Sequence, residues 1–239
     1  MNSAVGFAGF APEALEFLRD IRFHNSKTWY ESHKPEYRRL LLEPFQKLVA
    51  DLSGAMLEID PEFITVPAVD KTISRIYRDT RFSKDKSLYR DSIWLTFKRP
   101  SPDWKEAPVY FFEVSPESYR YGMGFYTASK PFMDRFRALL EAEPEVFVAA
   151  IQPLQSQSVF VVEGERYKKV PKYTVPVEVR EWLEYKSFYL ASNHRPDERL
   201  FKPDLLNCLT EGFRQLAPLY RYLWEIKWLV NAEGKNGKI

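Results

Sequence analysis

The sequence predicts an α+β domain in which helices flank a central antiparallel sheet. Apolar residues recur every three or four positions near both ends of the chain, which is the helical period. Between them, β-branched and aromatic residues alternate with polar ones in short runs, which is the period of a strand. Short turns join these runs, so a meander is favoured over crossover connections. We expect one domain over residues 1–232 and a frayed tail over residues 233–239.

The first helices are predicted from apolar spacing and from proline positions. Pro12–Ile21 has the pattern of a short amphipathic helix, and a proline suits its first turn. An Asn-Ser pair ending at Ser26 is suited to cap the next helix. The stretch Lys27–Ile59 is then predicted to be helical, with Pro35 and Pro44 as boundaries or kinks.

Three strands are predicted in the middle of the chain, at Ile93–Phe97, Val109–Val114 and Tyr119–Tyr126. The stretch Ile73–Asp79 is a candidate for one further strand of the same sheet. The connections after the first two strands contain Pro, Ser, Asp and Glu, which favour tight turns. These three strands therefore form the predicted meander.

The second half returns to helical spacing with two more strands. A helix is expected from Ser129 to Glu143, and another from there through Leu154. Two further strands are expected at Val159–Val162 and Phe188–Ala191, with a helical stretch Val177–Tyr185 between them. The last expected element is a long helix, Asp204–Val230, that Pro218 kinks or splits.

Composition and charge exclude several classes of protein. The chain of 239 residues is 45% hydrophobic, too apolar for a disordered protein, and it has no run of 18 apolar residues. The net charge of +2 gives no overall field that would favour nucleic acid or a membrane. A single cysteine, Cys208, excludes an internal disulfide, and the first ten residues lack a signal-peptide pattern, so we expect a cytoplasmic protein.

One basic segment stands out against this balance. Residues 71–90 carry seven Lys and Arg against Asp79 and Asp85, a local charge of +5 in a chain of +2. Arginine forks suit phosphate or carboxylate groups, and the following turn adds further donors. The predicted ligand-binding residues here are Arg75, Arg78, Arg81, Ser83, Lys84, Lys86 and Tyr89. The alternative is that the arginines and aspartates form structural ion pairs around a turn.

The same segment carries a family resemblance. Ser74–Tyr89, with the sequence SRIYRDTRFSKDKSLY, resembles the signature of the uncharacterised family called domain of unknown function 2461. Phe17-Leu18 with Asn25–Tyr37, and the Gly-rich Tyr121–Phe125, are similar to other parts of that family. The resemblance covers nearly the whole chain. It implies an α+β domain of similar size and no established activity.

A second candidate segment follows the third strand. Gly122 and Gly124 permit close approach of the backbone, while Ser129 and Lys130 at the next helix start offer donors to an anion. If this segment meets the basic one, the two form one pocket for a small anion. The alternative is that the glycines accommodate a bulge or facing aromatic rings and that Ser129 only caps a helix.

Other chemistry has little support in the sequence. The three histidines His24, His33 and His194 are far apart and follow no ligand spacing, so no metal site is predicted. Cys208 is expected to be a small buried hydrophobe of the last helix. Asp79 and Asp85 have basic neighbours, which favours salt bridges over acid–base catalysis.

Three functions compete on this sequence, and it does not decide whether the protein is an enzyme. The first is binding or turnover of a small phosphate- or carboxylate-bearing ligand at Arg75–Lys86. The second is a non-catalytic protein-interaction module in which that segment is a lattice of ion pairs. Nucleic-acid binding is a weaker alternative, because the total charge is near zero. The sequence identifies neither a cofactor nor an oligomeric state.

Overall fold

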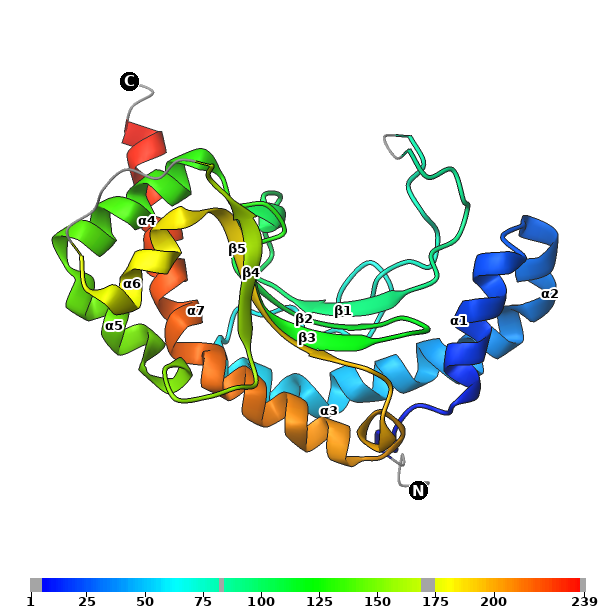
Figure 1. Ribbon diagram of the computed structural model, residues 1–239. Helices are drawn as coiled ribbons and strands as arrows, with labels where there is room; N and C mark the ends of the chain where they lie inside the picture. Colours follow the sequence, from blue (N-terminus) through cyan, green and yellow to red (C-terminus); the bar gives the residue numbers. More distant parts are fainter. Residues whose placement is uncertain (1–5, 82–83, 169–174, 237–239) are drawn as a thin grey trace. The chain divides into compact units, whose positions relative to one another are not determined.

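A computed structural model describes residues 6–81, 84–168 and 175–236, and it confirms the α+β class. Figure 1 shows the helices and strands along the chain. The helices are α1 (Glu13–Phe23), α2 (Lys27–Tyr37), α3 (Glu43–Ile59), α4 (Lys130–Ala142), α5 (Pro144–Ile151), α6 (Val177–Arg180) and α7 (Asp204–Asn236). The strands are β1 (Ile93–Phe97), β2 (Val109–Val114), β3 (Tyr119–Gly124), β4 (Val161–Arg166) and β5 (Tyr185–His194).

The five strands form one antiparallel sheet in the order β1-β2-β3-β5-β4. The first three are the predicted meander. The last two pair with each other, with Val161 opposite Ala191 and Glu165 opposite Ser187. Strand β5 therefore lies between β3 and β4, an order that alternation along the sequence does not reveal.

The chain clusters into two compact units. Unit 1 comprises Met1–Lys98, Phe111–Tyr121 and Asn193–Glu211. Unit 2 comprises Arg99–Tyr110, Gly122–Ser192 and Gly212–Ile239. The single domain over residues 1–232 stays a prediction. Helix α7 extends beyond it to Asn236, and residues 237–239 lie outside the described residues.

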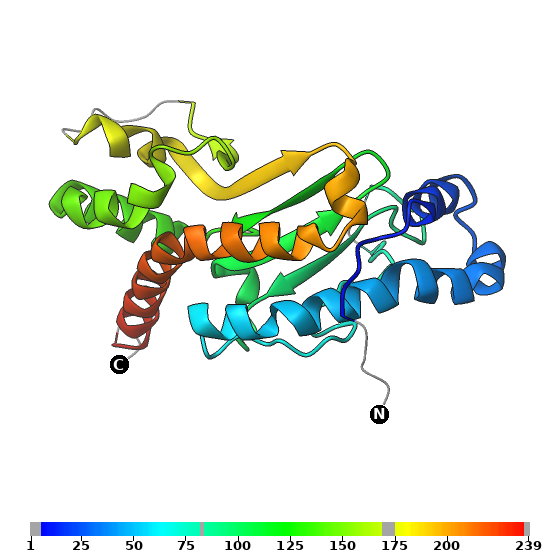
Figure 2. The same cartoon turned by 90° about the horizontal axis from the view of Figure 1, so that it is seen from below.

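Unit 1 begins with a long helical run interrupted by a π-helical turn. Ser26 caps α2 by accepting a hydrogen bond from the Trp29 amide at 3.3 Å, as predicted for this position. Residues 38–42 form the π-helical turn between α2 and α3, and the run is continuous through it (Figure 2). Pro35 lies inside α2 and Pro44 in the first turn of α3, so neither proline stops the run.

Each unit has its own aromatic core. In unit 1 the rings of Phe10, Phe45 and Phe112 pack with centroids 5.1 to 6.0 Å apart. In unit 2 the ring of Phe188 packs on those of Phe136 and Trp182 at 5.5 and 5.3 Å. Burial of such rings stabilises each unit by several kcal/mol per cluster, on the order of 2 kcal/mol for each ring. Aromatic residues make up 16% of the chain, and many of their rings are buried in clusters of this kind.

Three expected elements or boundaries are wrong. Ile73–Asp79 makes only isolated bridges, which join Ile73 to Val69 and to Leu95 and Tyr77 to Tyr89, because the chain leaves β1 to pair with its own return. The other corrections are that β4 starts at Val161 and not at residue 159, and that Tyr185 opens β5 and does not end a helix. Of the two outcomes expected at Pro218, a split does not occur, because α7 continues through this proline, and the helix bends along its length instead (Figure 2). The ends of these elements depend on pairing partners and on packing, and the local sequence pattern carries no information about either.

An arginine of α1 joins the helix to two loops of unit 1. The Arg22 guanidinium donates to both carboxylate oxygens of Glu117 at 2.8 and 2.7 Å, and to Asp91 at 2.6 Å. These hydrogen bonds lower the pKa of Glu117 below its ordinary value, with the Arg22 side chain as the main cause. The pair therefore contributes stability above the unfolded pKa of about 4.3 and loses it as pH falls.

We predict that Glu117→Gln lowers the melting temperature at neutral pH, with a cost below about 1 kcal/mol because the pair is at the surface. The cost should shrink and then vanish as pH falls through the lowered pKa of Glu117, because the wild-type carboxyl is then protonated too. Thermal melts across this pH range measure it. The exposed Glu36 of α2 supplies a control, since Glu36→Gln should show no such pH-dependent cost. A constant difference between Glu117→Gln and wild type at all pH values would contradict the prediction.

Candidate functional site

Residues 71–90 of unit 1 form the basic hairpin. Its first arm lies beside β1, where the Ser74 amide donates to the Trp94 carbonyl and the Thr96 amide to the Thr72 carbonyl, both at 2.8 Å. The arm then leaves β1. The Arg78 amide bonds the Leu88 carbonyl and the Arg90 amide the Ile76 carbonyl, again at 2.8 Å. The segment is therefore a two-stranded ribbon that extends away from β1 (Figure 1).

Three arginines of the basic hairpin are paired with aspartates. The Arg81 guanidinium donates two parallel hydrogen bonds to the Asp79 carboxylate, from Nε to Oδ1 at 3.0 Å and from Nη2 to Oδ2 at 2.8 Å. Arg78 Nη2 lies 3.2 Å from Asp85 Oδ2, and Arg75 pairs with Asp70. A carboxylate thus already fills a part of each fork that an outside anion would use.

These contacts keep the aspartates ionised. The Arg81 side chain is the main cause that holds the pKa of Asp79 well below its usual range. The backbone amide of Ser87 is the main cause that lowers the pKa of Asp85, with a smaller contribution from the charge of Arg78. An acid or base that exchanges protons near neutral pH needs the opposite shift. Both carboxylates therefore suit salt bridges.

The turn of the basic hairpin presents cations to solvent. Lys84 and Lys86 are exposed, and the Lys86 ammonium donates to the Thr80 carbonyl at 2.9 Å. Arg90 donates to the carbonyls of Arg75 and Tyr77 at 3.1 and 3.2 Å, which ties the two arms together. Ser83, a predicted ligand-binding residue, lies outside the described residues.

Tyrosine rings support the base of the hairpin. Tyr89 is buried, and its ring stacks on that of Tyr30 with centroids 4.5 Å apart. The half-exposed ring of Tyr77 lies 5.0 Å from Tyr89 and meets Tyr30 edge-on. Burial raises the pKa of Tyr89 to about 12 and likewise that of Tyr37. Tyr89, expected to bind a ligand, is thus placed in the packing beneath the ribbon.

Asn25 fastens this hairpin to the first helices. Its amide nitrogen donates to the carbonyls of Tyr89 at 2.9 Å and Ile21 at 3.1 Å, and its Oδ1 accepts from the Tyr89 amide at 2.9 Å. One side chain thereby satisfies both backbone groups of a residue 64 positions away. Sequence reasoning assigned Asn25 no such role, because the partner is distant in the chain.

The predicted residues Gly122, Gly124, Ser129 and Lys130 all belong to unit 2. A Cβ on Gly122 would lie 1.8 Å from the Leu190 carbonyl oxygen, so glycine is required by the approach of β5. Ser129 occupies the N-cap position of α4, but its side chain makes no capping hydrogen bond. The Lys130 ammonium pairs with Asp134 at 2.5 Å. The two halves of the predicted anion site thus fall in different units.

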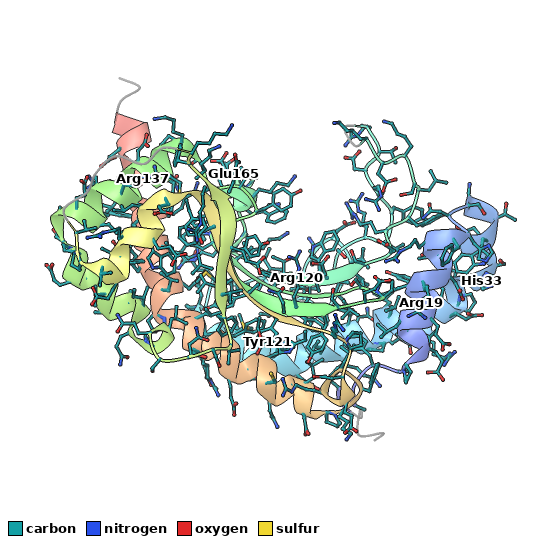
Figure 3. The ribbon with its side chains drawn as sticks, viewed as in Figure 1. Arg19, His33, Arg120, Tyr121, Arg137 and Glu165 are labelled. Carbon is teal, nitrogen blue, oxygen red and sulfur yellow. The ribbon has the colours of Figure 1, made fainter. Side chains whose placement is uncertain are left out.

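A second polar cluster in unit 1 surrounds the cysteine. Cys208 Sγ is half-buried and lies 3.3 Å from the Tyr121 hydroxyl and 3.8 Å from Arg199 Nη1. Neighbouring side chains of a strand point to opposite faces, and the Tyr121 side chain leaves β3 on the face opposite to that of Arg120 (Figure 3). On that face its hydroxyl meets Cys208. The ring of His194 stacks on Tyr121 at 6.0 Å, and burial lowers the pKa of His194. Cys208 therefore has polar neighbours, contrary to the expectation of an apolar environment.

Neither a metal site nor a membrane-spanning helix is found in the described part of the chain. Within residues 6–81, 84–168 and 175–236, no group of three or more His, Cys, Asp or Glu side chains is placed to hold a metal ion. The helices of these same residues include none that combines the length and the apolar character required to cross a membrane.

Comparison with protein families matches residues 13–222 to the conserved hypothetical proteins of DUF2461. The match includes both predicted site segments and every strand of the sheet. A search of the curated proteins finds no match. The basic hairpin, with its Ser74–Tyr89 signature, lies well inside the matched region, and this chain belongs to the DUF2461 family.

Proposed function

We propose that this protein is a non-catalytic binding module whose basic hairpin docks on an acidic segment of a partner protein. The observation that carries the proposal is the pairing of Arg75, Arg78 and Arg81 with aspartates of the same region. These pairs stiffen the ribbon and occupy the forks that a small anion would need. The seven cations of residues 71–90 still outnumber the acids, so the ribbon attracts negative charge.

The surface of the basic hairpin has the composition of a protein interface. Tyr77 and Leu88 are large apolar side chains that are 46% and 45% exposed. They lie among exposed arginines and lysines, and interfaces are enriched in tyrosine and arginine. A stiff, two-stranded, projecting element also loses little conformational entropy on binding. These features support docking to a macromolecule over enclosure of a small ligand.

We predict that a fluorescein-labelled peptide of ten glutamates binds the wild-type protein and that added salt weakens the binding, because exposed charges are screened. Lys84→Glu with Lys86→Glu should weaken it about tenfold or more, since two attractive contacts become repulsive. Fluorescence anisotropy at low and moderate salt measures both. Failure of the wild type to bind at low salt would refute the docking function.

The control for this prediction makes the same change of charge elsewhere in unit 1. Lys27 and Lys47 are exposed on α2 and α3, and Lys27→Glu with Lys47→Glu should retain most of the affinity. An equal loss in both double variants would show that total charge, and not the hairpin, attracts the peptide. Tighter binding of a single-stranded oligonucleotide with a steep salt dependence would favour the nucleic-acid alternative.

A small anion at the same hairpin is the second candidate, and Arg78 favours it. Its side chain is largely buried, and its Nε has no hydrogen-bond partner among the described residues. A phosphate or carboxylate that displaced Asp85 would satisfy this donor. Thermal shifts with inorganic phosphate and citrate test it, since a ligand-dependent rise in wild type that Arg78→Ala abolishes would favour this candidate. A cytoplasmic location suits both candidates, because the chain has a single cysteine.

A further inference from the structure

Two side chains of α7 in unit 2 carry buried donors that bond to no described residue. Lys227 is only 6% exposed, and its ammonium lies 4.0 Å from Glu106 Oε2, which is too far for a hydrogen bond. The indole Nε1 of Trp224 is buried, and no residue that the structure describes accepts its hydrogen. Buried lysines and indoles of folded proteins normally have a partner. These two donors are therefore suited to an acceptor from outside the chain.

The connection between β1 and β2 brings further charge to the same side of α7. Trp224 and Lys227 are three positions apart in the helix, so their side chains are neighbours on its surface. The Arg99 guanidinium lies over the Trp224 ring, 4.3 Å from the ring centroid. Glu106, at the end of the 3-10 turn Trp104–Glu106, faces Lys227. One connection of unit 2 thus contacts both donor side chains.

The charges of this cluster favour an anion. Two cations, Arg99 and Lys227, meet one carboxylate, Glu106, so their formal charges sum to +1. The ammonium has three N–H donors and the indole has one, and neither group accepts a hydrogen bond. A water molecule accepts from such donors but leaves the positive charge in place, whereas an oxyanion also neutralises it. Glu106 is 50% exposed, so an anion can approach from its side.

We propose that Trp224 and Lys227 bind a small oxyanion, a carboxylate or a phosphate, in unit 2. The Lys227 ammonium holds it by charge and by hydrogen bonds, and the Trp224 indole donates to one of its oxygens. Side chains three positions apart in a helix have Cβ atoms about 5–6 Å apart, so one anion can accept from both. All residues of this cluster belong to unit 2, whereas the basic hairpin belongs to unit 1. The proposal is therefore independent of the docking function.

The Trp224 indole reports such binding directly in two-dimensional proton–nitrogen NMR. Trp224→Phe identifies the indole signal by its loss, and titration with sodium phosphate or with sodium acetate should shift this signal in the wild-type protein. The anion that shifts it at lower concentration identifies the preferred class. Trp228 of the same helix is 69% exposed, and its indole signal should stay in place. No shift of the Trp224 signal with either anion, or an equal shift with sodium chloride at the same ionic strength, would overturn the proposal.

A variant of the lysine tests its role in the same titration. Lys227→Met keeps an unbranched side chain and removes the ammonium, so it should raise the dissociation constant of the anion about tenfold or more. Arg221 is exposed on the same helix, and Arg221→Met, which removes one positive charge as well, should retain binding. Arg78→Ala should also retain binding, because it changes only the hairpin. Circular dichroism verifies that each variant is folded. Unchanged affinity of Lys227→Met, or an equal loss in Arg221→Met, would refute the site.

Discussion

Gly122→Ala should strongly destabilise the protein. The new Cβ would lie 1.8 Å from the Leu190 carbonyl oxygen and 2.8 Å from its carbon, both backbone atoms of β5. Neither atom can move without separating β3 from β5. Overpacking of this kind costs about 3 kcal/mol, at the upper end of the usual range, because backbone must shift. Thermal or urea unfolding measures the loss.

A glycine in open space provides the control for Gly122. Gly54 lies in α3, and a Cβ added to it meets no other atom within 4 Å. Gly54→Ala should therefore raise stability by about 0.5–1 kcal/mol, because alanine loses less conformational entropy in a helix. Opposite effects of one methyl group at the two sites are the expected result. A tolerated Gly122→Ala would mean that β5 does not approach β3 as closely as the structure shows.

The second large effect is expected for Asn25→Ala. The substitution removes three hydrogen bonds and leaves the Tyr89 amide and carbonyl without a partner in a partly buried place. An unsatisfied buried polar group costs about 1–3 kcal/mol, so we expect a loss of about 2–3 kcal/mol in total. The melting temperature should fall by about 4–10 °C for a chain of this size.

The control for Asn25 is an asparagine with an exposed side chain. Asn207 lies in α7 within unit 1, and Asn207→Ala should leave stability unchanged or raise it slightly through helix propensity. Because Asn25 fastens the basic hairpin, Asn25→Ala should also weaken binding of the glutamate peptide if docking is the function. A melting temperature within about 1 °C of wild type would contradict the role assigned to Asn25.

Local patterns predicted much of the fold. The spacing of apolar residues located β1, β2, α1 and α4 to within about two residues, because periodicity reports which side of an element is buried. It was harder to predict which extended stretches join the sheet. The stretch Ile73–Asp79 has strand-like residues, yet it pairs with its own return over residues 88–90 and enters no strand. The residues of this stretch would suit pairing with β1 as well as with residues 88–90, so its composition does not predict which of the two it pairs with.

The candidate site was also predicted only in part from the sequence. The sequence located the basic segment and its aspartates, and it left open whether the arginines bind an outside anion or those acids. The structure pairs Arg81 with Asp79 and Arg78 with Asp85. The neighbours of Cys208 come from β3 and from the turn after β5, and no motif in the sequence relates these segments to it.

By itself the sequence determined the class of fold, the order of most elements and the presence of a basic segment inside a nearly neutral chain. Only the tertiary structure decided that β5 lies between β3 and β4, that Gly122 is needed there, and that Asn25 holds Tyr89. The physical reason is that side-chain period and charge are properties of neighbouring residues. Strand order and hydrogen-bond partners depend on residues brought together only when the chain has folded.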